Sequence, residues 1–256
     1  MKHIHHLTGI ILIISGILFS SCSSTNMLTL SVTEPAPVYL PPDIKKIGIV
    51  NRSIPTDKTE KKLDKIDKIL SAEGKNLDRK GADNAIHGIH NELNRNDKLK
   101  EIKIIADPKI KGSAMGVFPS ALSWAEVSRI CKETDVDALF VLSFYDTDTK
   151  VDYKQVPIEI DGPMGLKVPA VEHHANVQTL IKTGWRIYDP VNKIIRDEYI
   201  INEKIMSTGT GINPLKAIEA VMGRKEAVLD VSTNIGHHYA LRILPYRIRV
   251  SRDYYV

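Results

Sequence analysis

Apolar positions along the chain recur with two different periods, and their order predicts the fold. Nearly continuous apolar stretches, rich in β-branched or aromatic residues, occur at 45–51 (KKIGIVN) and at 137–145 (DALFVLSFY). Short apolar runs bounded by proline or polar residues are typical of strands that are buried on both faces. We therefore expect 45–51 to be a central strand and 137–145 to lie in the middle of the sheet.

Between these two stretches, apolar residues recur every three or four positions, which is the period of an amphipathic helix. The pattern predicts one helix over 57–72 and another over 78–95, with Gly74 ending the first. The next stretch, 99–106 (LKEIKIIA), is again short and apolar and predicts a strand.

A third helix is expected over 120–134. Ser120 is its predicted N-cap and Ser123 is the alternative. Cys131 shares the apolar face of this helix, so we interpret it as a small buried hydrophobic residue rather than a catalytic thiol.

The second half of the chain predicts a long antiparallel hairpin. Its strands are 178–188 and 193–205, and the four-residue turn DPVN at 189–192 has proline at the second position, as type I turns prefer. Residues 156–171 precede this hairpin and contain three prolines and two glycines. We expect this segment to be an irregular excursion at the end of the sheet.

The C-terminal part begins with Asn213-Pro214, an N-cap followed by proline at the first helical position. A long helix is expected from there to about Ile243, with Gly223 as a candidate break. A final edge strand follows at 247–251, where Ile248 and Val250 alternate with arginines.

This mixture of strands and helices indicates an α/β fold: a mixed sheet with a central buried strand and a long antiparallel hairpin, covered by helices. We expect a single α/β domain over 43–256. Residues 22–42 are proline-rich at their end and are expected to be a tether, with a short edge strand at 28–33.

Residues 1–21 have the features of a lipoprotein signal peptide. The apolar run 7–19 is too short to span a bilayer, which takes roughly 20 residues, and has the length of a secretory signal core. It leads into LFSSC, which resembles the bacterial lipobox with Phe19 at the usual leucine position. This predicts cleavage before Cys22 and lipidation of Cys22. The alternatives are an ordinary cleaved signal and an uncleaved anchor helix.

Charge and cysteine content narrow the functional classes. The chain has 35 basic and 31 acidic residues, a net charge of +4, which is too mild to indicate nucleic-acid binding. It has two cysteines, so lipidation of Cys22 would leave Cys131 without an intramolecular disulfide partner. Arg247, Arg249 and Arg252 lie among tyrosines near the C-terminus. They are either an interaction surface, for anionic lipid or a partner, or the outward residues of an edge strand.

Candidate chemistry is sparse. Neighbouring residues on a strand point to opposite faces, so the pair His173-His174 cannot chelate one metal by itself, and no HExxH or CxxC motif is present. We expect no metal and no cofactor. Asp146 and Asp148 follow a strand end, and together with His173 and His174 they are the candidate residues of a groove. Such a groove would suit a hydrolase or a glycan-binding protein.

Four segments carry a resemblance to a known family. They are PAPVYLPPDIKKIGIVNRS at 35–53, SAEGKNLDRKGA at 71–82, the hairpin GWRIYDPVNKII and the closing LPYRIRVSRDYY. They resemble an uncharacterised lipoprotein family of Bacteroidota-type bacteria, a domain of unknown function. The order of elements is also similar to the amino-terminal domain of TolB and to the periplasmic domain of the curli secretion lipoprotein. The resemblance supplies no catalytic residue.

These observations favour a lipid-anchored, non-enzymatic envelope protein that binds another protein or supports an assembly at the outer membrane. Ser23, which follows the predicted lipidation site, is not the aspartate associated with inner-membrane retention. We therefore expect the outer membrane, and because no acidic run follows Ser23 we expect its periplasmic face. The alternative is an envelope hydrolase or glycan-binding protein that uses the groove near Asp146 and His173.

Overall fold

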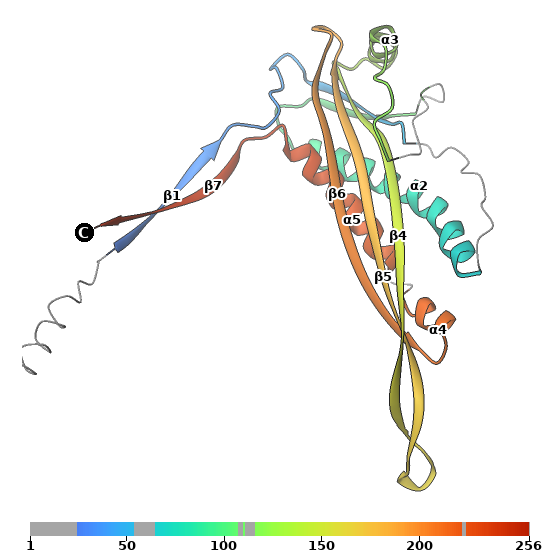
Figure 1. Cartoon of the computed structure of the whole chain (residues 1–256). Coiled ribbons are helices and arrows are strands. Elements are labelled where there is room, and N and C mark those ends of the chain that lie inside the picture. The colour runs from blue at the N-terminus through green and yellow to red at the C-terminus, as the bar shows by residue number, and fades with distance from the viewer. Residues whose placement is uncertain (1–24, 54–64, 107–109, 111–115, 222–223, 256) are drawn as a thin grey trace, which may run out of the picture. The chain divides into compact units, whose positions relative to one another are not determined.

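The computed structural model describes residues 25–53, 65–106, 110, 116–221 and 224–255. The chain forms two compact units. Among the described residues, one unit contains 25–35 together with 245–255, and the other lies within Ala36–Leu244. In the described part there are two sheets, one of two strands and one of five (Figure 1).

The larger unit is built on the five-stranded sheet, whose strand order is β3-β2-β4-β5-β6. Its strands are β2 (Lys46–Asn51), β3 (Glu101–Ile105), β4 (Ala138–Asp161), β5 (Lys167–Asp189) and β6 (Ile194–Gly211). β2 pairs in parallel with β3 and β4, whereas β4, β5 and β6 are antiparallel. The mixed α/β sheet predicted from the sequence is confirmed, with β2 inside the sheet and β4 in its middle.

Helices make two separate hydrophobic cores with this sheet. α2 (Lys65–Leu93) and α5 (Arg224–Leu241) pack on residues such as Phe140 and Trp185. α3 (Trp124–Thr134) packs on Leu139 and Val141. Neighbouring strand residues point to opposite faces, so the continuous apolar run of β4 contributes to both cores.

Trp185 belongs to the core on the side of α2 and α5. The side chain is fully buried and its ring stacks on that of Tyr239, with centroids 4.8 Å apart. Its indole Nε1 donates a hydrogen bond to Thr183 Oγ1 at 3.0 Å, so the one polar atom of the side chain is satisfied inside the core.

A β-bulge in β4 changes which residues face α2 and α5. The register with β5 shifts between Leu142 and Phe144, and both Leu142 and Tyr145 belong to the core on the α2 and α5 side. Odd-numbered residues of β4 therefore face these helices after the bulge. Asp146 and Asp148 consequently lie on the opposite face.

Two helix boundaries differ from the predictions. Gly74 does not end a helix, because α2 continues through it from Lys65 to Leu93. A glycine costs only about 1 kcal/mol inside a helix, and each added residue gains a hydrogen bond once the helix is nucleated. The predicted start at 57 lies outside the described residues. α3 begins after Ser123, the alternative N-cap, whose hydroxyl accepts from the Glu126 backbone in a capping box.

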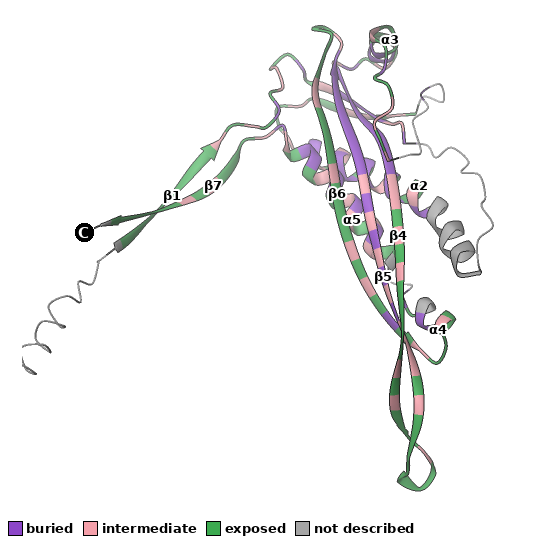
Figure 2. Cartoon of the chain, viewed as in Figure 1, coloured by how far each residue is buried: buried purple, intermediate pink, exposed green. Residues whose placement is uncertain are grey.

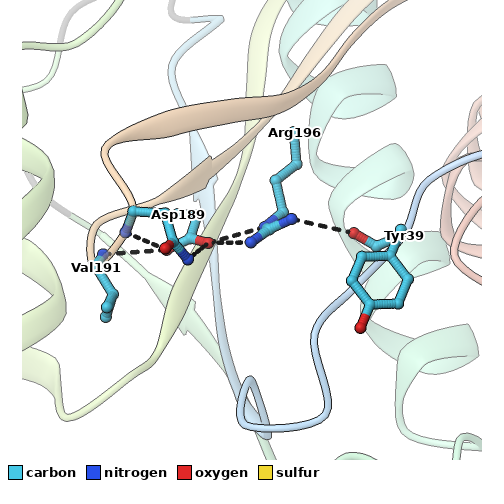
Figure 3. A network of polar contacts seen from close by, with 5 residues as sticks. Tyr39, Asp189, Val191 and Arg196 are labelled. Atoms are coloured by element: carbon cyan, nitrogen blue, oxygen red, sulfur yellow. Dashed lines mark hydrogen bonds and ion pairs between the residues drawn. The ribbon is translucent and has the colours of Figure 1, made fainter.

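The predicted hairpin is confirmed, and its turn is held by one buried carboxylate (Figure 3). Asp189 Oδ1 accepts hydrogen bonds from the backbone N–H groups of Val191 and Asn192, at 3.0 and 3.1 Å. Its Oδ2 accepts from Arg196 Nε at 2.8 Å. Arg196 also donates to the Tyr39 carbonyl, so the turn is tied to the segment before β2.

The prediction for 156–171 is wrong. This segment is not an irregular excursion, because β4 and β5 continue through it as paired strands and reverse only at the short 3₁₀ turn Pro163–Gly165. Proline is tolerated on edge strands, where its missing N–H removes no ladder bond. Pro157 and Pro169 lie where β4 and β5 pair only with each other, so both strands are edges there.

The smaller unit is a two-stranded antiparallel ribbon of β1 (Thr25–Glu34) and β7 (Tyr246–Tyr255). The strand expected at 28–33 is confirmed, and its partner is the strand expected at 247–251. That strand lies in this ribbon and not at the edge of the larger sheet.

The expected C-terminal helix corresponds to α4 (Pro214–Glu219) and α5. Asn213 caps α4 by accepting from the Lys216 N–H at 2.9 Å. The candidate break at Gly223 lies outside the described residues.

Candidate interaction surface

The four residues of the candidate groove do not converge. On β4, Asp148 is six residues before Lys154, and Lys154 is the register partner of His174. At a rise of about 3.4 Å per residue, Asp148 and His174 are therefore roughly 20 Å apart along the sheet. His173 pairs with Gln155 and so lies on the opposite face from His174.

Three of these residues have local surroundings of their own. The Asp146 carboxylate lies against Gly116, which has a positive φ of 59°. The His173 ring stacks on Tyr153, with centroids 5.5 Å apart, and its buried Nδ1 has no hydrogen-bond partner among the described residues. His174 Nε2 lies 2.7 Å from Glu172 Oε2. These are separate local contacts and do not make one site.

Cys131 is buried in α3, as expected from its position on the apolar helix face. Burial raises the pKa of its thiol to about 12. The thiol is therefore protonated at neutral pH, which agrees with a packing role.

Two further observations concern metals and membranes. Among the described residues, no three His, Cys, Asp or Glu side chains are grouped so that they could hold a metal ion. In the same part of the chain, no helix has the length and apolar character needed to cross a membrane. Cys22 lies outside the described residues.

The most prominent surface feature of the larger unit is a two-stranded extension of the sheet, which we call the arm (residues 156–172). β6 ends by pairing Gly211 with His173, and only β4 and β5 continue beyond that point. Figure 1 shows this extension, and Figure 2 shows that the buried residues of both strands end before it. None of residues 156–172 is buried.

One face of the arm is apolar. Ile158 and Ile160 alternate with Pro157 and Glu159 on β4, and Ile160 is the register partner of Val168. The apolar members of this face are Val156, Ile158, Ile160, Val168 and Ala170, and Glu172 lies opposite Val156 where the face begins. Ile160 is 48% and Val168 is 40% exposed. Apolar side chains gathered in this way on an exposed surface are typical of an interaction site.

The tip of the arm adds two exposed apolar side chains. Met164 is 96% and Leu166 is 66% exposed. The reversal is ordered by a hydrogen bond from the Gly162 N–H to the Leu166 carbonyl at 2.8 Å, and Met164 and Gly165 both have positive φ. A defined turn therefore presents Met164 at the end of the arm.

The arginines of the predicted interaction surface lie on β7, in the smaller unit, and all three are exposed. Arg247 pairs with Thr33 and Arg249 with Ser31, on one face of the ribbon. Arg252 pairs with Leu28 and lies on the other face.

Sequence reasoning missed the arm, although a signal was present. Val156, Ile158 and Ile160 alternate with polar residues or proline, as in a strand with one apolar face. The prolines and glycines of 156–171 favoured an irregular segment instead. Two matched alternating runs around the short PMG turn would have been the evidence for a hairpin.

The chain belongs to the family described as a domain of unknown function (DUF8603), whose model matches residues 44–255. The expectation of an uncharacterised family is thereby confirmed. Comparison with curated proteins found no match.

Solved structures show only a loose likeness in fold. The PelC dodecamer from Paraburkholderia phytofirmans is 10% identical, with 84% of this chain and 96% of that chain covered and a TM-score of 0.32. The hypothetical protein CT253 from Chlamydia trachomatis is 12% identical, with 78% of this chain and 98% of that chain covered and a TM-score of 0.29.

Proposed function

We propose that this protein is a lipid-anchored, non-enzymatic component of the cell envelope that binds another protein through the arm. The observation that carries the proposal is the exposed apolar face and tip of residues 156–172. Fully burying one large apolar side chain contributes about 1.5–3 kcal/mol, so several such side chains together can offset the cost of association.

The face of the arm suits binding better than its edges do. Unpaired edges of two strands can accept a further strand from a partner. Pro157 and Pro169 each remove a backbone donor from the arm, which is a common way to block pairing at an edge. Contact through the apolar side chains of Ile160, Val168 and Leu166 is therefore the favoured mode.

The proposed location follows from the N-terminal sequence. Cleavage before Cys22 and acylation of that cysteine would attach the chain to a membrane, since two or three acyl chains give durable anchoring. Ser23 favours the outer membrane, and the lack of an acidic run after it favours the periplasmic face. The proposal includes the finer assignment to a lipoprotein family of Bacteroidota-type bacteria.

The alternative function, a hydrolase or glycan-binding protein, required Asp146, Asp148, His173 and His174 to meet in one groove. The strand register separates Asp148 from His174 by roughly 20 Å and puts His173 on the other face. No observation favours this alternative over the arm.

The test is co-purification of partners from a detergent-solubilised envelope of the bacterium of origin. Ile160→Asp places a charge on the apolar face of the arm and is expected to reduce partner recovery about tenfold or more. Glu159→Lys changes the charge of the neighbouring residue on the opposite face and is the matched control. Recovery of no reproducible partner, or equal losses with both variants, contradicts the proposal.

The anchor is tested separately by metabolic labelling with a radioactive fatty acid. Label is expected in the wild-type chain and not in Cys22→Ser. An unlabelled wild-type chain, or one that still carries residues 1–21, contradicts the lipid anchor.

A further inference from the structure

The β1–β7 ribbon has one continuous apolar face. The antiparallel register pairs Leu30 with Val250 and Val32 with Ile248, and residues two apart on a strand share a face. The face consists of Leu28, Leu30, Val32, Ile248 and Val250. Leu28 is 50%, Leu30 is 53% and Val32 is 39% exposed.

The opposite face of the ribbon is polar and basic. The hydroxyls of Thr29 and Ser251 form a hydrogen bond of 3.0 Å across the strands. Ser31 pairs with Arg249 and Thr33 pairs with Arg247. The ribbon is therefore amphipathic along most of its length, although Arg252 lies on the apolar face and Met27 on the polar face.

A ribbon of this kind needs something to cover its apolar face. Two isolated strands are at best marginally stable in water, because they bury little apolar surface between them. The exposed fractions of Leu28, Leu30 and Val32 show that this face is open to solvent.

The distance to Cys22 indicates what covers the apolar face. Cys22 precedes Thr25, the first residue of β1, by three residues. Three residues span at most about 11 Å, so an acylated Cys22 would hold the start of the ribbon within the headgroup region of the bilayer.

The side chains at this end of the ribbon suit the same environment. Tyr254 pairs with Asn26 and is 50% exposed, and tyrosine is enriched where a membrane meets water. Arg252 pairs with Leu28 on the apolar face, where its guanidinium can reach anionic lipid phosphates.

We infer that the apolar face of the β1–β7 ribbon lies on the membrane surface and binds lipid in the plane of the interface. The inference rests on the proposed lipid anchor for its place in the cell. The outer edges of β1 and β7 are not paired with a further strand in the described residues. Unpaired backbone groups are not tolerated in the hydrocarbon core, so the ribbon lies at the interface and does not span.

The experiment supplies the anchor chemically, so it does not depend on lipidation in the cell. All described elements lie between Thr25 and Tyr255, so the chain from Cys22 onward is used. Cys22 is coupled to vesicles that contain a maleimide-bearing phosphatidylethanolamine. Cys131 does not react, because its thiol is buried and protonated.

The depth of a ribbon residue in the bilayer is measured by the quenching of tryptophan fluorescence by brominated lipids. The signal of the unsubstituted chain is subtracted. Leu30→Trp probes the apolar face and Ser31→Trp, one residue further, probes the polar face. Because an interfacial apolar face is buried about 5–10 Å, quenching is expected to be roughly twofold or more stronger for Leu30→Trp. Equal quenching, or none, overturns the inference.

A second measurement introduces a carboxylate on either face of the ribbon, in place of a tryptophan, and compares vesicle binding. The unacylated Cys22→Ser chain is mixed with vesicles of phosphatidylethanolamine and phosphatidylglycerol, and bound protein is measured by sedimentation. Leu30→Asp should lower the partition coefficient about tenfold, whereas Thr29→Asp should change it far less. Equal losses, or a ribbon that cross-links to a second copy while no lipid is bound, overturn the inference.

These results separate the inference from the proposed function. Failure of fatty-acid labelling in the cell would contradict the anchor while leaving both vesicle measurements valid. Failure of the vesicle measurements with normal labelling would contradict only the role of the ribbon. Circular dichroism of each variant confirms that the fold is retained.

Discussion

Gly236 in α5 lies directly against the backbone of Ala85 in α2, so closely that a Cβ on Gly236 would overlap the Ala85 carbonyl oxygen. Gly88 has the reciprocal relationship with the Thr233 carbonyl. The two helices therefore cross with their backbones in contact, and this crossing fixes the layer that covers one face of the sheet.

Gly236→Ala is expected to destabilise the fold by about 2 kcal/mol. Overpacking costs about 1–3 kcal/mol, and the higher helix propensity of alanine offsets up to about 1 kcal/mol of that. The backbone of α2 cannot move away as a flexible side chain can, so we expect the overpacking cost to lie near the upper end of its range, before the propensity offset. Urea denaturation measures the change. Asp230→Ala, at an exposed position of the same helix, is the control and should stay within about 0.5 kcal/mol.

Asp189→Asn is expected to cost about 2–3 kcal/mol at pH 7, because it leaves the largely buried Arg196 without its charged partner. Burial raises the pKa of the Asp189 carboxyl, but hydrogen bonds from Asn192 and Arg196 outweigh this effect and lower the pKa below its usual value. Its contribution to stability is therefore present above the unfolded pKa, about 3.9, and is lost as the pH falls through the lower folded pKa.

The difference between wild type and Asp189→Asn should accordingly shrink below about pH 4, as measured by urea denaturation over a pH series. Glu133→Gln, which removes an exposed partner of Arg129, should cost less than about 1 kcal/mol. A constant difference from pH 7 to pH 2 would contradict the assignment.

Tyr145→Phe tests how much the buried Tyr145 hydroxyl contributes to stability at neutral and at alkaline pH. The Tyr145 hydroxyl forms a hydrogen bond of 2.6 Å with Ser232, and burial raises its pKa. The variant should be about 1 kcal/mol less stable than wild type at pH 7. Above about pH 10 the unfolded state releases the tyrosine proton and the folded state does not, so wild type loses about 1.4 kcal/mol per pH unit from this group.

The difference in the free energy of unfolding between Tyr145→Phe and wild type should therefore disappear as the pH rises from 10 to 11, as measured by urea denaturation. Ser232→Ala removes the same hydrogen bond and keeps the tyrosine. Its difference in the free energy of unfolding from wild type should therefore remain over this pH range. Parallel behaviour of the two variants would contradict the prediction.

Cys131 is expected to be unreactive in the folded protein. With a pKa of about 12, its thiolate fraction at pH 8 is on the order of a thousandfold below that of a free cysteine. Iodoacetamide labelling of Cys22→Ser, followed by mass spectrometry, measures the reaction. Rapid labelling without denaturant would show that the thiol is accessible.

Shortening the arm should separate binding from stability. Gln155 and His173 are register partners, so residues 156–172 can be replaced by Asn-Gly, the preferred pair for a two-residue hairpin turn. None of the removed residues is buried, so we expect a stability change within about 1 kcal/mol. Partner recovery from the envelope should be lost, and its retention would contradict the proposed function.

The sequence predicted those parts of the fold whose causes are local. The DPVN turn was identified because proline at its second position is typical of a type I turn, and in the structure Asp189 accepts hydrogen bonds from the Val191 and Asn192 N–H groups. The strand at 137–145 was identified because its short apolar run, rich in aromatic and β-branched residues, is typical of a strand buried on both faces. Ser123 was identified as a possible cap from its spacing to the first turn of α3.

The candidate groove depended on strand ends that local patterns placed wrongly. Asp146 and His173 seemed to be neighbours because each was placed near a strand end. Those ends do not exist, since β4 runs on to Asp161 and β5 begins at Lys167. Prolines and glycines are equally compatible with a loop and with a solvent-exposed ribbon, and composition does not distinguish between them.

By itself, the sequence determined the α/β class and the hairpin turn, and it placed Ser123 and Asn213 among the candidate helix caps, because each depends on residues within a few positions of one another. Only the tertiary structure decided that β1 pairs with β7, that the arm is a continuous ribbon and that the four groove candidates lie apart. Such pairings depend on the apolar area that distant segments bury together, weighed against the entropy of closing the chain between them, and no local pattern records that balance.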